Sequence, residues 1–179
     1  MRIVEGGVPK DILRSYSTDL GTGEFFTYVG NLVTIEQAIS VIGVLSPDFV
    51  EIDDHVFWTA NGEEFICGTS QFVGLKESGT GALVRSNERR DVERYQNNFS
   101  VSQFFTRWDG SSDTPIIKVG LNENDYRLCH LFAEQIAIHW KKALREAFPK
   151  RAFEFDVQDD LLDDFGVCVT FCQSSTQGK

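Results

Sequence analysis

Apolar positions recur at spacings of three and four over residues 123–148, and this is the strongest pattern in the chain. Such a recurrence places the apolar side chains on one stripe of an α-helix. Asn122 is a residue type that caps helix N-termini, and Phe148-Pro149 ends the segment because proline disfavours a helical residue before it. The sequence therefore predicts one long amphipathic helix at about 123–148. Its apolar stripe consists of Cys129, Phe132, Ala133, Ile136, Ala137, Trp140, Ala143, Leu144, Ala147 and Phe148.

Two extended segments follow this helix. Residues 152–157 and 165–172 are rich in aromatic and β-branched residues, which favour strands. In the second segment the side chains are apolar or neutral on both faces, as in a strand that is covered on both sides. The sequence therefore predicts a C-terminal β-hairpin whose second strand is central in its sheet.

The rest of the chain carries shorter signals. Thr34 and Gln37 are spaced as a capping box, which predicts a helix at about 35–45. Asn61-Gly62 predicts a hairpin turn, because this pair tolerates the positive φ angles of a type I′ turn. The other expected elements are strands at 25–29, 49–52, 55–60, 64–67, 82–85 and 115–120, helices at 88–96 and 101–108, and a loop at 68–81.

Together these elements indicate an α+β fold, with a mixed or antiparallel sheet and the long amphipathic helix packed on one face. Apolar residues make up 41% of the chain, which is enough to bury a core. Because 179 residues fit one domain, we expect a single α+β domain over 1–173 and a disordered polar tail over 174–179.

Charge adds information about partners. The formal net charge is −10, which repels phosphate backbones, so we expect no nucleic-acid partner and regard a basic protein as the better candidate. No apolar run approaches the roughly 18 residues of a membrane span, and the first thirty residues lack the apolar stretch of a signal peptide. We therefore expect a cytoplasmic protein with no membrane partner. The sequence leaves its oligomeric state open.

Motifs of the common enzyme chemistries are absent from the sequence. It contains no G-x-S-x-G, H-E-x-x-H, G-x-G-x-x-G or C-x-x-C motif. Residues 74–80 approach the pattern of a phosphate-binding loop but lack its lysine, so a surface loop is the better interpretation. The four cysteines are dispersed and suit small buried positions. We expect no cofactor and no metal.

The densest charge run lies between the two C-terminal strands. Its spacing departs from the Asp-x-Asp-x-Asp-Gly pattern of calcium loops. Two interpretations remain: a solvated loop that limits pairing at a sheet edge, or an acidic face offered to a basic protein. The pair Leu161-Leu162, which we expect to be exposed, fits the second, because interfaces combine an apolar centre with a polar rim. The candidate binding residues are Asp159, Asp160, Leu161, Leu162, Asp163 and Asp164.

Two other clusters give weaker signals. Asp53 and His55 share a face if they lie in a strand, and a carboxylate beside an imidazole can orient a general base. A turn is the simpler interpretation, since aspartate favours turns. A basic patch is interleaved with acidic residues, which indicates a neutralised helix surface rather than an anion site. The patch consists of Arg85, Arg89, Arg90 and Arg94.

The leading hypothesis is a non-catalytic protein–protein interaction module with an acidic binding surface, a profile typical of immunity or antitoxin proteins. The alternative is a small-molecule-binding or enzymatic α+β domain with an aromatic-lined pocket, in which Asp53 and His55 form the polar pair. A homo-oligomer with a structural role is the third hypothesis. The candidate pocket walls are Trp58, Phe104, Phe105, Trp108 and Trp140.

Overall fold

The computed structural model of the chain describes residues 8, 29–30, 32–59, 73–105, 107–108, 117–118 and 121–174. The chain forms two compact units, Met1–Leu45 and Ser46–Lys179. Because the structure describes only part of the first unit, the single domain expected over 1–173 stays a prediction. Most of the expected strand at 25–29 and of the expected tail lies outside the described residues.

In the first unit, helix α3 spans Ile35–Leu45 and confirms the predicted helix. Its capping box forms as expected: Gln37 N donates to Thr34 Oγ1 at 3.2 Å, and Thr34 N donates to Gln37 Oε1 at 2.9 Å. An isolated helix of this length is marginal in water. The two reciprocal hydrogen bonds therefore contribute to its stability by satisfying amides at its N-terminus.

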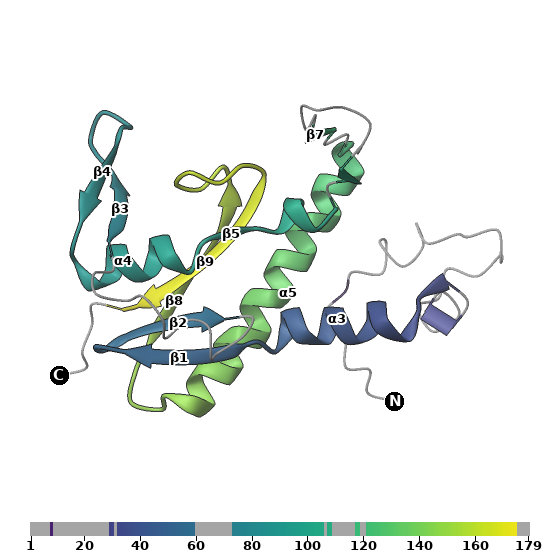
Figure 1. Ribbon diagram of the computed structural model, residues 1–179, viewed down its shortest axis with the longest axis horizontal. Helices are drawn as coiled ribbons and strands as arrows, with labels where there is room; N and C mark the ends of the chain where they lie inside the picture. The colour runs from purple at the N-terminus through teal and green to yellow at the C-terminus, as the bar shows by residue number, and fades with distance from the viewer. Residues whose placement is uncertain are drawn as a thin grey trace, which may run out of the picture. The chain divides into compact units, whose positions relative to one another are not determined.

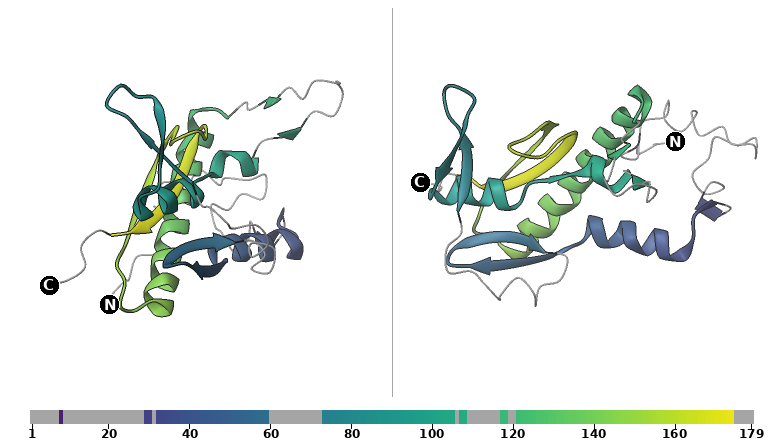
Figure 2. Two further views of the ribbon diagram at one scale, coloured as in Figure 1. Left: turned by 60° about the vertical axis from the view of Figure 1, so that its left-hand side comes forward. Right: turned by 45° about the horizontal axis from the view of Figure 1, so that its top comes forward.

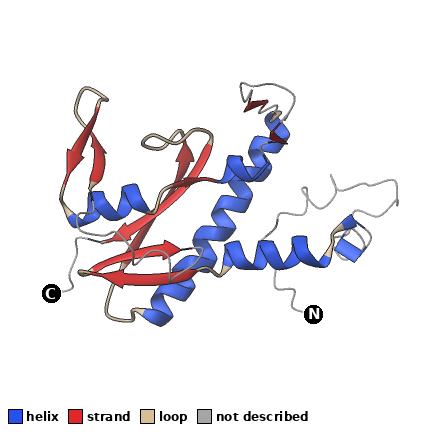
Figure 3. Cartoon of the chain, viewed as in Figure 1, coloured by secondary structure: helices blue, strands red, loops and turns tan. Residues whose placement is uncertain are grey.

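The second unit contains the predicted long helix and hairpin, so the chain has an α+β fold (Figures 1 and 3). Helix α5 spans Glu123–Ala147, and Asn122 forms a capping box with Asp125. Its buried side chains all belong to the predicted apolar stripe: they are Cys129, Ala133, Ile136, Trp140 and Leu144.

The hairpin after α5 joins β8 (Phe153–Asp159) to β9 (Val167–Gln173) in an antiparallel sheet with the order β5-β9-β8. Strand β5 is the short segment Phe99–Ser100. All seven residues of β9 are buried, which confirms the predicted central strand. One face contacts α5, and the other lies against α4 (Arg89–Gln96). This α4 is the helix predicted at 88–96.

A second hairpin joins β1 (Asp48–Ile52) to β2 (His55–Thr59). Its turn residues Asp53 and Asp54 have φ angles of 49° and 67°, which are the positive values of a type I′ turn. The strands predicted at 49–52 and 55–60 are therefore confirmed, and the turn between them takes the type I′ geometry. The turn predicted at Asn61-Gly62 lies outside the described residues.

A third hairpin joins β3 (Gly74–Glu77) to β4 (Leu83–Ser86) and extends beyond α4, away from α5 (Figure 2). The prediction of a loop throughout 68–81 is therefore wrong for β3, whereas the strand predicted at 82–85 is confirmed. Gly74 suggested a loop, but it serves close packing: a Cβ there would lie 2.5 Å from Val92 N of α4.

The predicted helix at 101–108 is wrong in type and in length. A 3-10 helix, η2, spans Val101–Phe105. The chain then turns into β6 (Arg107–Trp108), which pairs with β7 (Ile117–Lys118). Pairing with β7 takes the backbone of 107–108 out of the helix, which the local capping signal could not indicate. Strand β7 lies within the strand predicted at 115–120.

Two buried polar side chains, Glu93 of α4 and Asn97 at its C-cap, connect β2 to β9, which do not pair directly. Glu93 is fully buried and accepts from Val56 N of β2 at 2.8 Å and from Gln173 N of β9 at 2.6 Å. One turn later, Asn97 donates through Nδ2 to Val56 O at 3.0 Å and to Phe171 O at 3.1 Å. These side chains replace the backbone bonds that a strand between β2 and β9 would make.

We expect Glu93→Ala to lower the free energy of unfolding by about 3 kcal/mol or more, because buried donors left unsatisfied cost about 1–3 kcal/mol each. The substitution removes the acceptor of Val56 N, Gln173 N and Gln173 Nε2. Urea denaturation measures the loss. Glu88→Ala is the control, since its ion pair with Lys76 is exposed and is screened by solvent. Equal losses in the two variants would contradict the bridging role of Glu93.

Candidate functional site

The aspartate-rich loop between β8 and β9 is closed by a pair of hydrogen bonds across its base. Asp160 N donates to Gly166 O at 2.9 Å, and Gly166 N donates back to Asp160 Oδ1 at 2.8 Å. Both residues have positive φ, 52° at Asp160 and 77° at Gly166. A Cβ at Gly166 would lie 2.7 Å from Ser102 Oγ, so glycine is required there by both conformation and space.

Asn98, which follows α4, fixes the middle of this loop. Its Nδ2 donates to Leu161 O and to Asp164 Oδ2, each at 2.9 Å. Leu161 is only 2% exposed and belongs to the core. The expectation that Leu161 is an exposed interface residue is therefore wrong. Its neighbour Leu162 is half-buried and has a positive φ of 59°, so it is not an exposed apolar centre either.

The tip of the loop is also anchored, yet its aromatic side chain is exposed. Tyr95 OH donates to Asp163 Oδ2 at 3.0 Å, and Ser100 Oγ donates to Phe165 O at 2.6 Å. The side chain of Phe165 is nevertheless 81% exposed. The sequence suggested that Phe165 begins a buried strand, but β9 begins two residues later. The exposed apolar residue of the acidic loop is therefore Phe165.

The carboxylates of the loop have different surroundings. Asp159, at the end of β8, lies 3.0 Å from His130 Nε2 of α5. Asp160 and Asp163 are exposed, whereas Asp164 is half-buried. Burial, followed by the charge of Asp163, raises the pKa of the Asp164 carboxyl. All four predicted aspartates lie together, and each also makes a contact within the protein.

Asp53 lies in the turn between β1 and β2, and His55 is the first residue of β2. The simpler interpretation, a turn, is therefore confirmed. His55 Nδ1 lies 3.0 Å from the backbone oxygen of Asp53, so this contact does not use a carboxylate. The adjacent carboxylate of Asp54 pairs with Arg89 at 2.7 Å and with Arg151 at 3.0 Å. These contacts explain the cluster as the fixed end of the β1–β2 hairpin.

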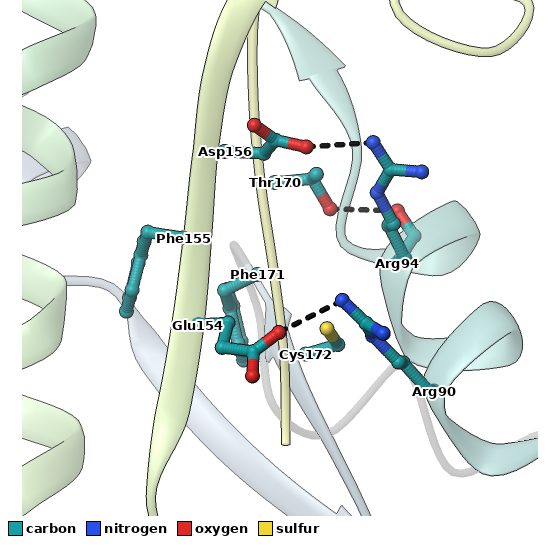
Figure 4. Close-up of a pocket in the computed structure, with 8 residues that line it drawn as sticks. All are labelled: Arg90, Arg94, Glu154, Phe155, Asp156, Thr170, Phe171 and Cys172. Atoms are coloured by element: carbon teal, nitrogen blue, oxygen red, sulfur yellow. Dashed lines mark hydrogen bonds and ion pairs between the residues drawn. The ribbon is translucent and has the colours of Figure 1, made fainter. Parts of the chain in front are cut away.

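The basic patch on α4 is paired with acidic residues, which confirms a neutralised surface. Arg90 bonds Glu154 of β8 at 2.8 Å, and Arg94 bonds Asp156 at 2.6 Å (Figure 4). The same residues line a pocket of about 290 Å³ between α4 and the hairpin. Arg89 is likewise paired, and Arg85 lies exposed in β4.

The candidate walls of an aromatic pocket that the structure describes differ in their surroundings. Trp58 and Trp140 pack against each other with ring centroids 5.6 Å apart, and Trp140 is 1% exposed. Phe104 and Phe105 are about half exposed on η2. The side chain of Trp108 lies outside the described residues. Trp140 thus belongs to the core, and the half-buried Trp58 packs against it.

The thiols of the described cysteines lie in the interior of the protein. Cys129, Cys168 and Cys172 are free and buried, and burial raises the pKa of each thiol. A raised pKa disfavours the nucleophilic thiolate. Within the described ranges, no three histidine, cysteine, aspartate or glutamate side chains converge as they would around a metal ion. In the same part of the chain, no helix has both the length and the apolar composition needed to cross a bilayer.

No protein-family model, no curated protein and no solved structure matches the chain.

We expect Asp164→Asn to stabilise the protein at neutral pH. The folded state holds the Asp164 proton more tightly than the unfolded chain, so stability falls as pH rises through the raised pKa. Asparagine keeps an oxygen that can accept from Asn98 but carries no charge. Urea denaturation should show the gain at neutral pH and its disappearance at acid pH, where the carboxyl is protonated in both states. A variant less stable than the parent at neutral pH would contradict this prediction.

Proposed function

We propose that the chain is a cytoplasmic, non-catalytic protein–protein interaction module that binds a basic partner through the loop Asp159–Phe165. The observation that carries the proposal is the 81% exposure of Phe165 in a loop that is itself closed and anchored by hydrogen bonds. Large aromatic residues are enriched at interface centres, where their burial supplies much of the binding free energy.

The order of the loop supports this proposal energetically. Binding costs free energy for every loop that must be fixed in place, and this cost is lower when the loop is ordered beforehand. Here the base is closed between Asp160 and Gly166, and the tip is held by Ser100. Burial of Phe165 in a partner would therefore contribute to affinity, and little of this free energy would be spent on fixing the loop in place.

The surrounding charge specifies the partner. Asp159, Asp160, Asp163 and Asp164 precede Phe165 in the same loop, and the whole chain has a net charge of −10. An acidic surface attracts a basic protein over several ångströms and accelerates association, and salt weakens this attraction. The apolar centre gives affinity, while the acidic rim selects a basic partner.

We expect Phe165→Ala to reduce capture of the partner at least about thirtyfold, since an interface centre contributes about 2 kcal/mol or more. The tagged protein is used as bait in a lysate of the native cells, and captured proteins are quantified by mass spectrometry. Ile138→Ala is the matched control, because Ile138 is a 58% exposed apolar residue on α5, away from the loop. Equal capture by the Phe165→Ala variant and the parent would contradict the proposal.

We expect replacement of the four loop aspartates by asparagine to reduce capture and its dependence on salt. Asparagine retains a side-chain oxygen, so the bonds from Gly166, Asn98 and Tyr95 keep an acceptor while the charges are lost. The same capture assay is run at low and high salt. The control removes four exposed carboxylates elsewhere and should preserve capture: Glu77→Gln, Glu123→Gln, Glu134→Gln and Glu146→Gln. An equal loss in both variants would mean that net charge alone attracts the partner.

A further inference from the structure

One edge of β9 is satisfied position by position. Strand β5 forms backbone hydrogen bonds with part of this edge. At other positions, side chains form hydrogen bonds with the backbone of β9. Val167 N donates to Ser102 Oγ at 3.0 Å, Phe171 O accepts from Asn97, and Gln173 N donates to Glu93. Strand β8 occupies the opposite edge of β9 along its whole length. Strand β8 also has an outer edge, formed by the backbone amides and carbonyls that point away from β9.

The direction of the β8 backbone groups follows from the two ends of the hairpin. Asp160 N donates to Gly166 O, and Ser174 N donates to Ala152 O. In an antiparallel pair, hydrogen-bonded positions alternate, so the even-numbered residues of β8 bond to β9. The amides and carbonyls of Phe153, Phe155 and Val157 therefore point away from β9. In the described part of the chain, β8 pairs with β9 alone.

We propose that this outer edge of β8 accepts an extended segment of the basic partner as an added antiparallel strand. Every described strand pair of the protein is antiparallel, which sets the orientation. The inference rests on the proposed function, because it specifies how the same partner is held. Addition of a strand supplies main-chain hydrogen bonds, and the side chains beside the edge supply specificity.

Side chains along β8 define the sequence that fits. On one face, Glu154 and Asp156 line the pocket beside α4 and use one oxygen each in their pairs with arginine (Figure 4). On the other face lie Phe153, Phe155 and Val157, all half-buried. An added strand with alternating basic and apolar residues would place its basic side chains beside the carboxylates and its apolar side chains beside this second face.

A second copy of the chain fits this edge poorly. Antiparallel pairing of two β8 strands about Phe155 would place Glu154 of each copy opposite Asp156 of the other. Like charges directly opposite each other destabilise a strand pair. Arg90 and Arg94 of the same copy each pair with one oxygen of these carboxylates, which reduces the repulsion without removing it, so a basic segment fits the edge better than a second copy does.

The test uses a synthetic peptide of about nine residues, the length of a typical strand, in which lysine and valine alternate. Amide hydrogen exchange of the full chain is followed by NMR. We expect bound peptide to slow exchange at Phe153, Phe155 and Val157 by about tenfold or more, because these amides gain acceptors. Binding without protection of these amides, or no binding, would overturn the inference.

Two N-methylated peptides of identical charge sharpen the test. In the antiparallel arrangement, the valine amides face β8 and the lysine amides face away from it. Methylation of the valine amides should abolish protection, whereas methylation of the lysine amides should preserve it. Equal binding of the two peptides would overturn the inference whatever the stability of any protein variant.

A matched pair of protein variants tests the same edge. Val157→Pro removes an outward amide and leaves the bonds to β9 at the neighbouring positions, so it should weaken peptide binding about tenfold or more. Val157→Thr keeps the amide and should bind as the parent does. The Phe165→Ala variant should also bind the peptide normally. If the parent protein does not bind the peptide but its capture of the partner depends on Phe165, only the β8 edge is refuted. If the parent binds the peptide but its capture of the partner does not depend on Phe165, only the acidic loop is refuted.

Discussion

Glu93 of α4 and Asn97, the C-cap of the same helix, hold together two strands that do not pair with each other. Glu93 and Asn97 sit one helical turn apart, and their amide and carboxyl groups meet the outward backbone groups of β2 and of β9. A buried carboxylate is costly unless it is fully hydrogen-bonded, and Glu93 meets this condition by accepting from three donors. The end of α4 therefore connects β2 and β9 through side-chain hydrogen bonds, as an intervening strand would through its backbone. The position of the β1–β2 hairpin against the central strand depends on it.

The same stretch of chain also positions the acidic loop. Directly after Asn97, the segment Asn98–Ser100 leaves α4, bonds the middle and the tip of the loop, and forms β5 beside β9. The loop is thus held both by its own strands and by this short segment. This arrangement explains how a loop so rich in like charges keeps one conformation. Hydrogen bonds from neutral side chains oppose this repulsion, and the pKa of Asp164 is raised first by burial and then by the charge of Asp163.

Features were predictable from the sequence where the residues that determine them lie close together in the chain. The helix at 123–148 was predictable because its periodicity and cap lie within one segment. Gly74 misled because a glycine required for close packing cannot be told from a turn glycine without its neighbour. Glu93 could not be found as a buried bridge, since its partners lie 37 and 80 residues away. Leu161 and Phe165 exchanged their expected roles: positive φ angles in the loop break the alternation of a strand, so the leucine turns into the core and the phenylalanine turns out.

The two edges of the β8–β9 hairpin differ in a way that matters for association. The β9 edge carries polar side chains from η2 and α4 at the positions β5 does not reach, so it offers no template. The β8 edge keeps its outward groups and is protected by charge instead, with Glu154, Asp156 and Asp159 along it. Charged side chains limit pairing at a strand edge selectively, since acidic ones repel another acidic strand and attract a basic one. An edge blocked by side chains would exclude every partner equally. In the proposed binding mode, the carboxylates of the edge would favour a partner of opposite charge over a second copy of the chain, and the acidic loop would extend the same selection to the exposed ring of Phe165.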